Sequence, residues 1–132
     1  MAEMIQVRAI ARGVTQTPRK IGLVASLVRG RTVADALTIL SHTPKRAARP
    51  LTKVIESAKA NALNTHGLTD QGLLIHSLQI TAGPRLKRYR PVARGQAHPY
   101  QKRTSHIHVV VAGVEKPKKQ PAKKTTAKKE SK

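Results

Sequence analysis

A long basic segment without acidic residues, set between two apolar segments, restricts the possible folds of this chain most. Residues 83–106 read GPRLKRYRPVARGQAHPYQKRTSH, in which Lys and Arg recur and both Asp and Glu are absent. The flanking segments 74–82 and 107–111 alternate between apolar and polar residues, a pattern typical of β-strands. We therefore predict a long β-hairpin whose turn is formed by Arg94 and Gly95.

This hairpin has an expected register and an expected weakness. The turn predicts that Ile80 pairs with Val109, Leu78 with Val111, Tyr89 with Tyr100 and Lys87 with Lys102. An isolated two-stranded ribbon is marginally stable in water, and like charges opposite each other destabilise it further. Because proline donates no ladder hydrogen bond, we expect the pairing to open near Pro91 and Pro99. The outer hairpin should therefore be loosely ordered until a polyanion neutralises its charge.

The chain before the hairpin predicts one strand and three helices. Alternation indicates a strand over residues 5–12. Helix start and stop signals lie at Thr17-Pro18 and Gly30, at Thr32 and His42, and at Thr43-Pro44 and Gly67. Helical spacing predicts the buried faces, which are Ile21, Val24, Ala25 and Val28; Val33, Ala36, Leu37 and Leu40; and Ala47, Leu51, Val54, Ile55, Ala58 and Ala62. Pro50 predicts a kink or an interruption in the third helix near Arg49.

These elements predict an α+β fold, with three helices packed on one face of a small three-stranded antiparallel sheet and a long protruding β-hairpin. We expect a single domain over residues 1–114, with the hairpin at 83–106. Residues 115–132 read EKPKKQPAKKTTAKKESK, a low-complexity sequence of mainly Lys, Ala, Pro and Thr. Such a segment cannot repay the entropy of ordering, so we expect a disordered Lys-rich tail.

Composition excludes several classes of protein. The formal net charge is +20, with 26 Lys and Arg against 6 Asp and Glu, which favours a polyanionic partner. Cysteine is absent and the acids are scattered without the paired spacing of acid-base catalysis, so we predict no enzyme, metal or cofactor site. His106 and His108 share a strand face, but a zinc site needs further ligands. No apolar run approaches the roughly 20 residues of a membrane span, so we expect a cytoplasmic protein without membrane contact.

Two groups of residues allow both a functional and a structural interpretation. Thr17, Arg19 and Lys20 can bind phosphate at the start of the first helix, where free amides and the helix dipole favour anions. They can also form only a cap with solvated charges. Tyr89 and Tyr100 can stack on bases or pack against each other across the hairpin.

Several segments carry a family resemblance, namely TPRKIGLVASLVRGRTVADAL, TPKRAA, SAKANALNTHGL, GPRLKRYRPVARGQA and KRTSHIHVVV. From about Val7 to Ala112 the chain resembles the bacterial-type large-subunit ribosomal protein 22 family. The resemblance implies a structural constituent of the large ribosomal subunit that binds large-subunit (23S) rRNA, aids subunit assembly and lines the nascent-peptide exit tunnel with its hairpin. It implies as partners the rRNA, neighbouring large-subunit ribosomal proteins and the nascent peptide, with no homo-oligomer.

Residue by residue, the resemblance implies RNA contact at three places. These are Thr17, Arg19 and Lys20; Asn61, Asn64 and His66; and, in the hairpin, Arg85, Lys87, Arg88, Tyr89, Arg90, Arg94, Lys102, Arg103, Thr104 and Ser105. Asn and His are also common near helix C-termini, so the second group can also serve only to end the third helix. The tip expected to face the tunnel consists of Pro91, Val92, Ala93, Arg94, Gly95, Gln96 and Ala97.

Two other function classes fit a strongly basic chain. A DNA-architectural protein would bend duplex DNA with a basic ribbon and carry apolar wedges at its tip. A basic ribonuclease would cleave RNA and lose that activity when one acid or histidine is replaced. Preference for duplex DNA over folded rRNA at fixed salt would favour the first class, and RNA cleavage would favour the second.

Overall fold

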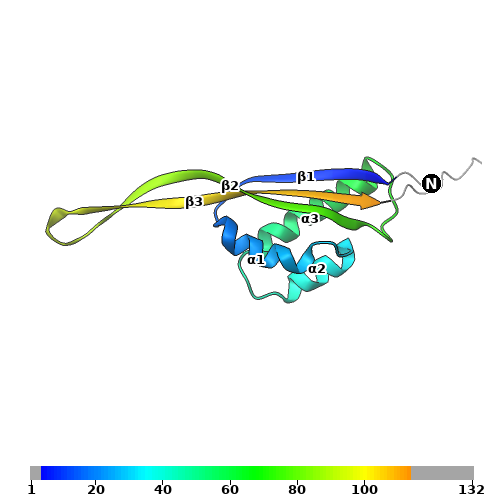
Figure 1. Ribbon diagram of the computed structural model, residues 1–132, viewed down its shortest axis with the longest axis horizontal. Coiled ribbons are helices and arrows are strands. Elements are labelled where there is room, and N and C mark those ends of the chain that lie inside the picture. The colour runs from blue at the N-terminus through cyan, green and yellow to red at the C-terminus, as the bar shows by residue number, and fades with distance from the viewer. Residues whose placement is uncertain (1–3, 114–132) are drawn as a thin grey trace, which may run out of the picture.

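The fold is a three-stranded antiparallel sheet covered on one face by three helices. The computed structural model describes residues 4–113. In chain order its elements are β1 (Ile5–Val14), α1 (Pro18–Val28), α2 (Val33–His42), α3 (Ala48–Asn64), β2 (Leu74–Pro91), the short 3-10 turn η1 (Ala93–Gly95) and β3 (Ala97–Gly113). The strand order is β1-β3-β2, and in Figure 1 α1 and α2 lie below the strands while α3 runs obliquely behind them. The predicted α+β fold is confirmed, whereas the predicted tail lies outside the described residues.

The core lies between the sheet and the helices. Alternation along the strands buries Val7 and Ala9 of β1 and Ile107, Val109 and Val111 of β3. All residues predicted for the buried faces of the helices are buried, apart from Leu37, which is half-buried. The apolar pattern therefore accounts for the core, with Ile, Val, Leu and Ala in place of large aromatic side chains.

The third helix begins later than its sequence signals predict. Thr43 ends α2, since its N–H donates to Leu40 O at 3.2 Å and its Oγ1 donates to Ile39 O at 2.7 Å. α3 starts at Ala48, so Pro50 lies in its first turn, where backbone N–H groups have no intrahelical acceptor. α3 is one helix over Ala48–Asn64, so the expected kink or interruption near Arg49 is wrong, because a proline at this position removes no helical hydrogen bond.

The hairpin register also differs from the predicted one. The loop spans residues 92–96 and is closed by a hydrogen bond from Val92 N–H to Gln96 O at 2.9 Å. Within it Arg94 and Gly95 have positive φ angles of 60° and 73°. The observed pairs are Tyr89 with Pro99, Arg88 with Tyr100, Lys87 with Gln101, Ile80 with Ile107 and Leu78 with Val109. The predicted pairs are wrong because the loop is longer than the assumed turn and because β2 contains bulges.

Two bulges shift β2 along β3. One lies between Ile75 and Ser77 and the other between Ala82 and Arg85. The first bulge buries both Ile75 and Leu78, although these residues are three apart in the sequence. Strict alternation over 74–82 predicts Leu74 and His76 on the buried side with Leu78, and this prediction is wrong, since both are exposed.

The two prolines do not open the hairpin as expected, since the ladder continues to the pair Pro91 and Ala97. In an antiparallel ladder, hydrogen-bonded pairs alternate with pairs whose N–H groups point away from the partner strand. Val92 and Gln96 form a hydrogen-bonded pair, so the pairs that contain Pro91 and Pro99, one and three positions further along the ladder, are pairs without hydrogen bonds. Their missing N–H groups therefore cost no cross-strand hydrogen bond.

Candidate nucleic-acid interface

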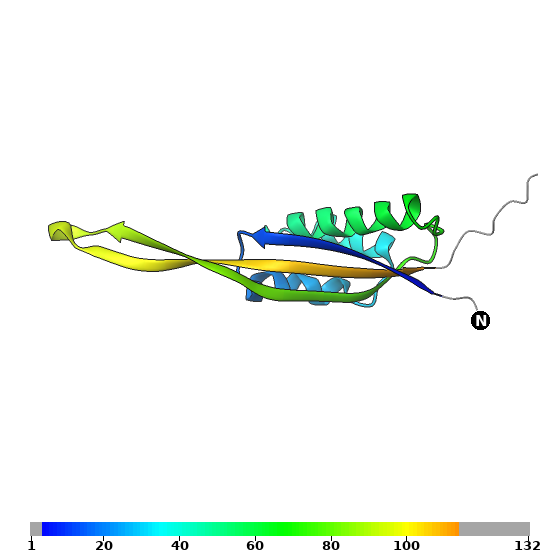
Figure 2. The ribbon, with the colours of Figure 1, turned by 90° about the horizontal axis from the view of Figure 1, so that it is seen from above.

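The outer hairpin, residues 84–103, is an exposed basic arm. Figure 2 shows it continuing β2 and β3 well beyond the helices, and every residue in it is exposed. Successive side chains of a strand point to opposite faces. Arg85 and Lys87 therefore lie on one face of the arm, and Arg88 and Arg90 lie on the other, so both faces can meet phosphates.

The charges of the arm are not balanced within the described chain. Among residues 4–113 the ion pair present is Lys59 Nζ to Asp70 at 2.8 Å, on the helical side of the body. Arg85 lies directly opposite Arg103 in the ladder. Like charges directly opposite destabilise a two-stranded pair, so an external anion would stabilise the arm.

The two tyrosines do not pack against each other. Arg88 lies opposite Tyr100, and the guanidinium carbon of Arg90 lies 5.0 Å from the centroid of the Tyr100 ring, within cation–π range. Tyr89 lies opposite Pro99 and is 72% exposed. The predicted tyrosine pair is wrong because the register differs by one residue. Stacking of a base on the exposed Tyr89 ring stays a prediction.

A cavity of about 540 Å³ lies where the arm joins the body. We call it the arm-base cavity and define it by six of its lining residues, Thr17, Lys20, Lys45, Arg46, Lys102 and Arg103. The fold thus brings together the start of α1, the loop between α2 and α3, and the part of β3 at the base of the arm. Thr17 occupies the N-cap position of α1, but its side chain makes no capping hydrogen bond, which favours its use toward an external group.

Lys45 and Arg46 line the arm-base cavity, although the sequence patterns do not single them out for RNA contact. The sequence predicts a helix start over 43–47, whereas this segment forms a loop between α2 and α3 that faces the arm base. The signal that could have found it is the run of basic residues in this segment. Arg19 is exposed beside the cavity but does not line it.

Thr104 and Ser105 lie inside the protein, at the base of the arm. Thr104 is 5% exposed, and its Oγ1 donates to Pro84 O at 2.7 Å across the bulge of β2. Ser105 is fully buried, and within residues 4–113 its Oγ has no hydrogen-bond partner. Both side chains are buried in this conformation, and Thr104 Oγ1 links β3 to β2 at the base of the arm, while RNA contact by the two residues stays a prediction.

The residues predicted at the end of α3 lie apart from the arm. Asn61 and His66 line a cavity of about 500 Å³ together with Arg8 of β1. Asn64 is exposed but does not line it. Figure 1 places this end of α3 at the end of the sheet away from the arm. The predicted contacts therefore form two separate surfaces.

Over residues 4–113, no three His, Cys, Asp or Glu side chains gather as a metal site would require. His106 Nδ1 accepts a hydrogen bond from Gly13 N–H at 3.0 Å, which joins β1 to the arm base. In the same range no helix has the length and hydropathy to span a bilayer.

One comparison with known proteins bears on this surface. A family model described as ribosomal protein L22p/L17e matches residues 9–112. The match covers most of the 132 residues, and it includes the whole arm and all residues that define the arm-base cavity.

Proposed function

This chain belongs to the ribosomal protein L22p/L17e family and is a structural protein of the large ribosomal subunit, and we propose that it binds large-subunit rRNA through the arm and the arm-base cavity. The family is one of ribosomal structural proteins and not of enzymes. Membership implies ribosomal RNA and ribosomal proteins as partners and the ribosome as location. A single domain over residues 1–114 and a cytoplasmic location remain predictions.

The observation that carries the proposal is the exposed arm with cations on both faces. Arginine binds phosphate with a planar fork of donors, and lysine acts as a point charge. Such contacts position a protein on folded RNA by shape and charge, with little base readout. Phosphates on both sides of the arm would offset the repulsion between Arg85 and Arg103, which lie opposite each other.

We further propose that the tip lines the nascent-peptide exit tunnel. The Lys and Arg residues of the arm concentrate in segments 85–90 and 102–103, whereas the tip segment 91–97 contains a single one, Arg94. The flanks would therefore bind the rRNA, and the tip would extend past it toward the nascent peptide. The compact loop over 92–96, closed between Val92 and Gln96, gives this tip a defined end.

Assembly of the subunit would follow from contacts at both ends of the body. The arm and the arm-base cavity lie at one end, and the cavity lined by Arg8, Asn61 and His66 lies at the other. A protein that binds RNA at both ends links RNA segments that are apart in the rRNA sequence. This supports a role in assembly by bridging.

The test is the salt dependence of rRNA binding by an arm variant. Replacing Arg88 by Gln removes one exposed charge and no core contact. We expect weaker binding of an rRNA transcript, and a log–log salt slope smaller by about 0.7–0.9 for one lost phosphate contact. Lys59→Gln is the control, since it removes one charge away from the arm. An unchanged slope for Arg88→Gln, tighter binding of duplex DNA at fixed salt, or cleavage of the RNA would contradict the proposal.

A further inference from the structure

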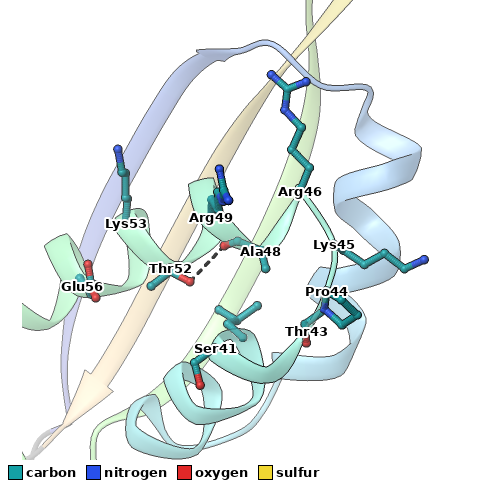
Figure 3. Close-up of a pocket in the computed structure, with 11 residues that line it drawn as sticks. Ser41, Thr43, Pro44, Lys45, Arg46, Ala48, Arg49, Thr52, Lys53 and Glu56 are labelled. Atoms are coloured by element: carbon teal, nitrogen blue, oxygen red, sulfur yellow. Dashed lines mark hydrogen bonds between the residues drawn. The ribbon is translucent and has the colours of Figure 1, made fainter.

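A second basic cavity, of about 850 Å³, lies between the end of α2 and the start of α3 (Figure 3). Its lining includes the cations Lys45, Arg46, Arg49 and Lys53 against a single acid, Glu56. We propose that this α2–α3 cavity binds a second stretch of RNA sugar-phosphate backbone. The inference rests on the proposed rRNA binding and names a further surface for it.

The cations of this cavity repel one another and outnumber its single acid, Glu56, four to one. Figure 3 shows Arg46, Arg49 and Lys53 extending toward the same side of the start of α3. Within residues 4–113 none of them forms an ion pair with a carboxylate. Arg49 and Lys53 are four residues apart on α3, a spacing at which like charges destabilise a helix. An anion bound here would reduce this repulsion.

The start of α3 adds to this cost. The positive end of a helix dipole is normally complemented by acidic side chains or a capping residue. α2 follows this rule with Thr32 and Asp35, whereas α3 has Ala47 as its N-cap, no side-chain cap and no acid in its first turn. The helix end and the side chains therefore present positive charge to the same cavity.

The two basic cavities form one continuous surface. Lys45 and Arg46 line both the arm-base cavity and the α2–α3 cavity. The surface therefore runs from Arg103 at the base of the arm to Lys53, one turn beyond Arg49 on α3. A small anion would need one such cavity, whereas a phosphate backbone matches a row of cations shared between two.

The chemistry of the lining favours RNA over an acidic protein partner. Protein interfaces usually have an apolar centre, and none of the large exposed apolar residues lines this cavity. The hydroxyls of Ser41, Thr43 and Thr52 donate to backbone carbonyls. The donors left for a ligand are thus the charged ends of Lys and Arg, which suit phosphate oxygens.

A matched pair of lysines on one helix tests the inference. The full chain would be compared as wild type, Arg49→Gln, Lys53→Gln and Lys59→Gln in binding a large-subunit rRNA transcript over a range of salt. Lys59 lies on α3 but lines neither cavity, and it pairs with Asp70. We expect Arg49→Gln and Lys53→Gln each to reduce the salt slope by about 0.7–0.9, with a smaller change for Lys59→Gln.

Each other outcome overturns part of the account. Equal effects of all three variants would mean that only net charge matters, and would refute the second site. Normal binding of free rRNA combined with poor incorporation of Arg49→Gln into reconstituted subunits would assign the cavity to a protein partner. A reduced slope for Arg88→Gln without one for Arg49→Gln or Lys53→Gln would remove the second site and leave the proposed function standing.

A positional probe gives an independent test, helped by the absence of cysteine in the chain. Ser41 lines the α2–α3 cavity, and Ser57 is an exposed residue of α3 that lines neither cavity. An iron chelate attached to Ser41→Cys should cleave bound rRNA at a defined segment, and the same chelate on Ser57→Cys should cleave it much less. Cleavage from position 41 no stronger than from position 57 would refute RNA at this cavity.

Discussion

Replacing Thr104 by Val tests whether this residue holds the arm base or contacts RNA. Thr104 is 5% exposed, and its Oγ1 donates to Pro84 O at 2.7 Å. The neighbouring backbone is tightly fitted, since a Cβ added to Gly83 would lie 2.5 Å from the same hydroxyl oxygen. Val keeps the shape of Thr but leaves the Pro84 carbonyl without this donor.

The expected loss of stability is modest and measurable. An acceptor left without its partner costs about 1–3 kcal/mol when buried, and the partly exposed position of this bond favours the lower end, about 1 kcal/mol. With a urea dependence on the order of 2 kcal/mol per molar, the unfolding midpoint should fall by roughly 0.5 M. The salt slope of rRNA binding should not change, because no phosphate contact is lost.

Urea unfolding followed by circular dichroism, together with rRNA binding over a range of salt, measures both quantities. Thr104→Ser is the control, since it keeps the hydroxyl, and it should keep most of the stability that Thr104→Val loses. A reduced salt slope for Thr104→Val with an unchanged unfolding midpoint would refute the structural role and return Thr104 to the RNA surface.

Three further variants follow from the fold. Ser105→Ala should leave the free energy of unfolding unchanged or raise it by up to about 1 kcal/mol, because it removes a buried hydroxyl that has no partner; a loss above this amount in urea unfolding would mean that the hydroxyl is bonded. Pro50→Ala should cost no more than about 1 kcal/mol, because Pro50 lies in the first turn of α3 and stiffens the unfolded chain; a gain near 3 kcal/mol would instead indicate the strained, kinked helix that the sequence predicts. Deletion of residues 88–96 should leave the helical circular dichroism signal and the unfolding midpoint of the body intact, because no core residue lies in the arm; loss of the helical signal would contradict this.

Local patterns predicted the elements and the core well. The helical spacing of Ile21, Val24 and Val28 and the strand alternation of Ile107 and Val109 are properties of a few neighbouring residues, and the structure buries all of them. Such patterns are fixed by the geometry of a single helix or strand. Such patterns can therefore be recognised in the sequence without knowledge of the rest of the fold.

Features that depend on two distant segments were harder to predict. The hairpin register depends on the five-residue loop 92–96 and on the bulges in β2, and neither has a strong sequence signal. The start of α3 was misplaced because Thr43-Pro44 has the pattern of a helix start while its threonine ends α2. Both errors arise where two local signals compete and tertiary packing decides between them.

The candidate interface was predictable in its charge but not in its assembly. The basic arm follows directly from an acid-free segment, so Arg85 to Arg103 could be proposed from composition and strand pattern alone. The arm-base cavity could not, because the fold brings Lys45 and Arg46 next to Lys102 and Arg103 from a distant part of the chain. Burial of Thr104 and Ser105, beside the bulge of β2 at 82–85, likewise depends on a segment that is distant in the sequence.

Amide hydrogen exchange of the free chain and of the chain bound to large-subunit rRNA tests the central claim most directly. We expect arm amides within 85–103 to exchange rapidly in the free protein at low salt and to become protected on rRNA, while amides of the core segment 107–111 of β3 are protected equally in both states. An arm that is already fully protected in the free protein, or one that gains no protection on rRNA, would contradict it.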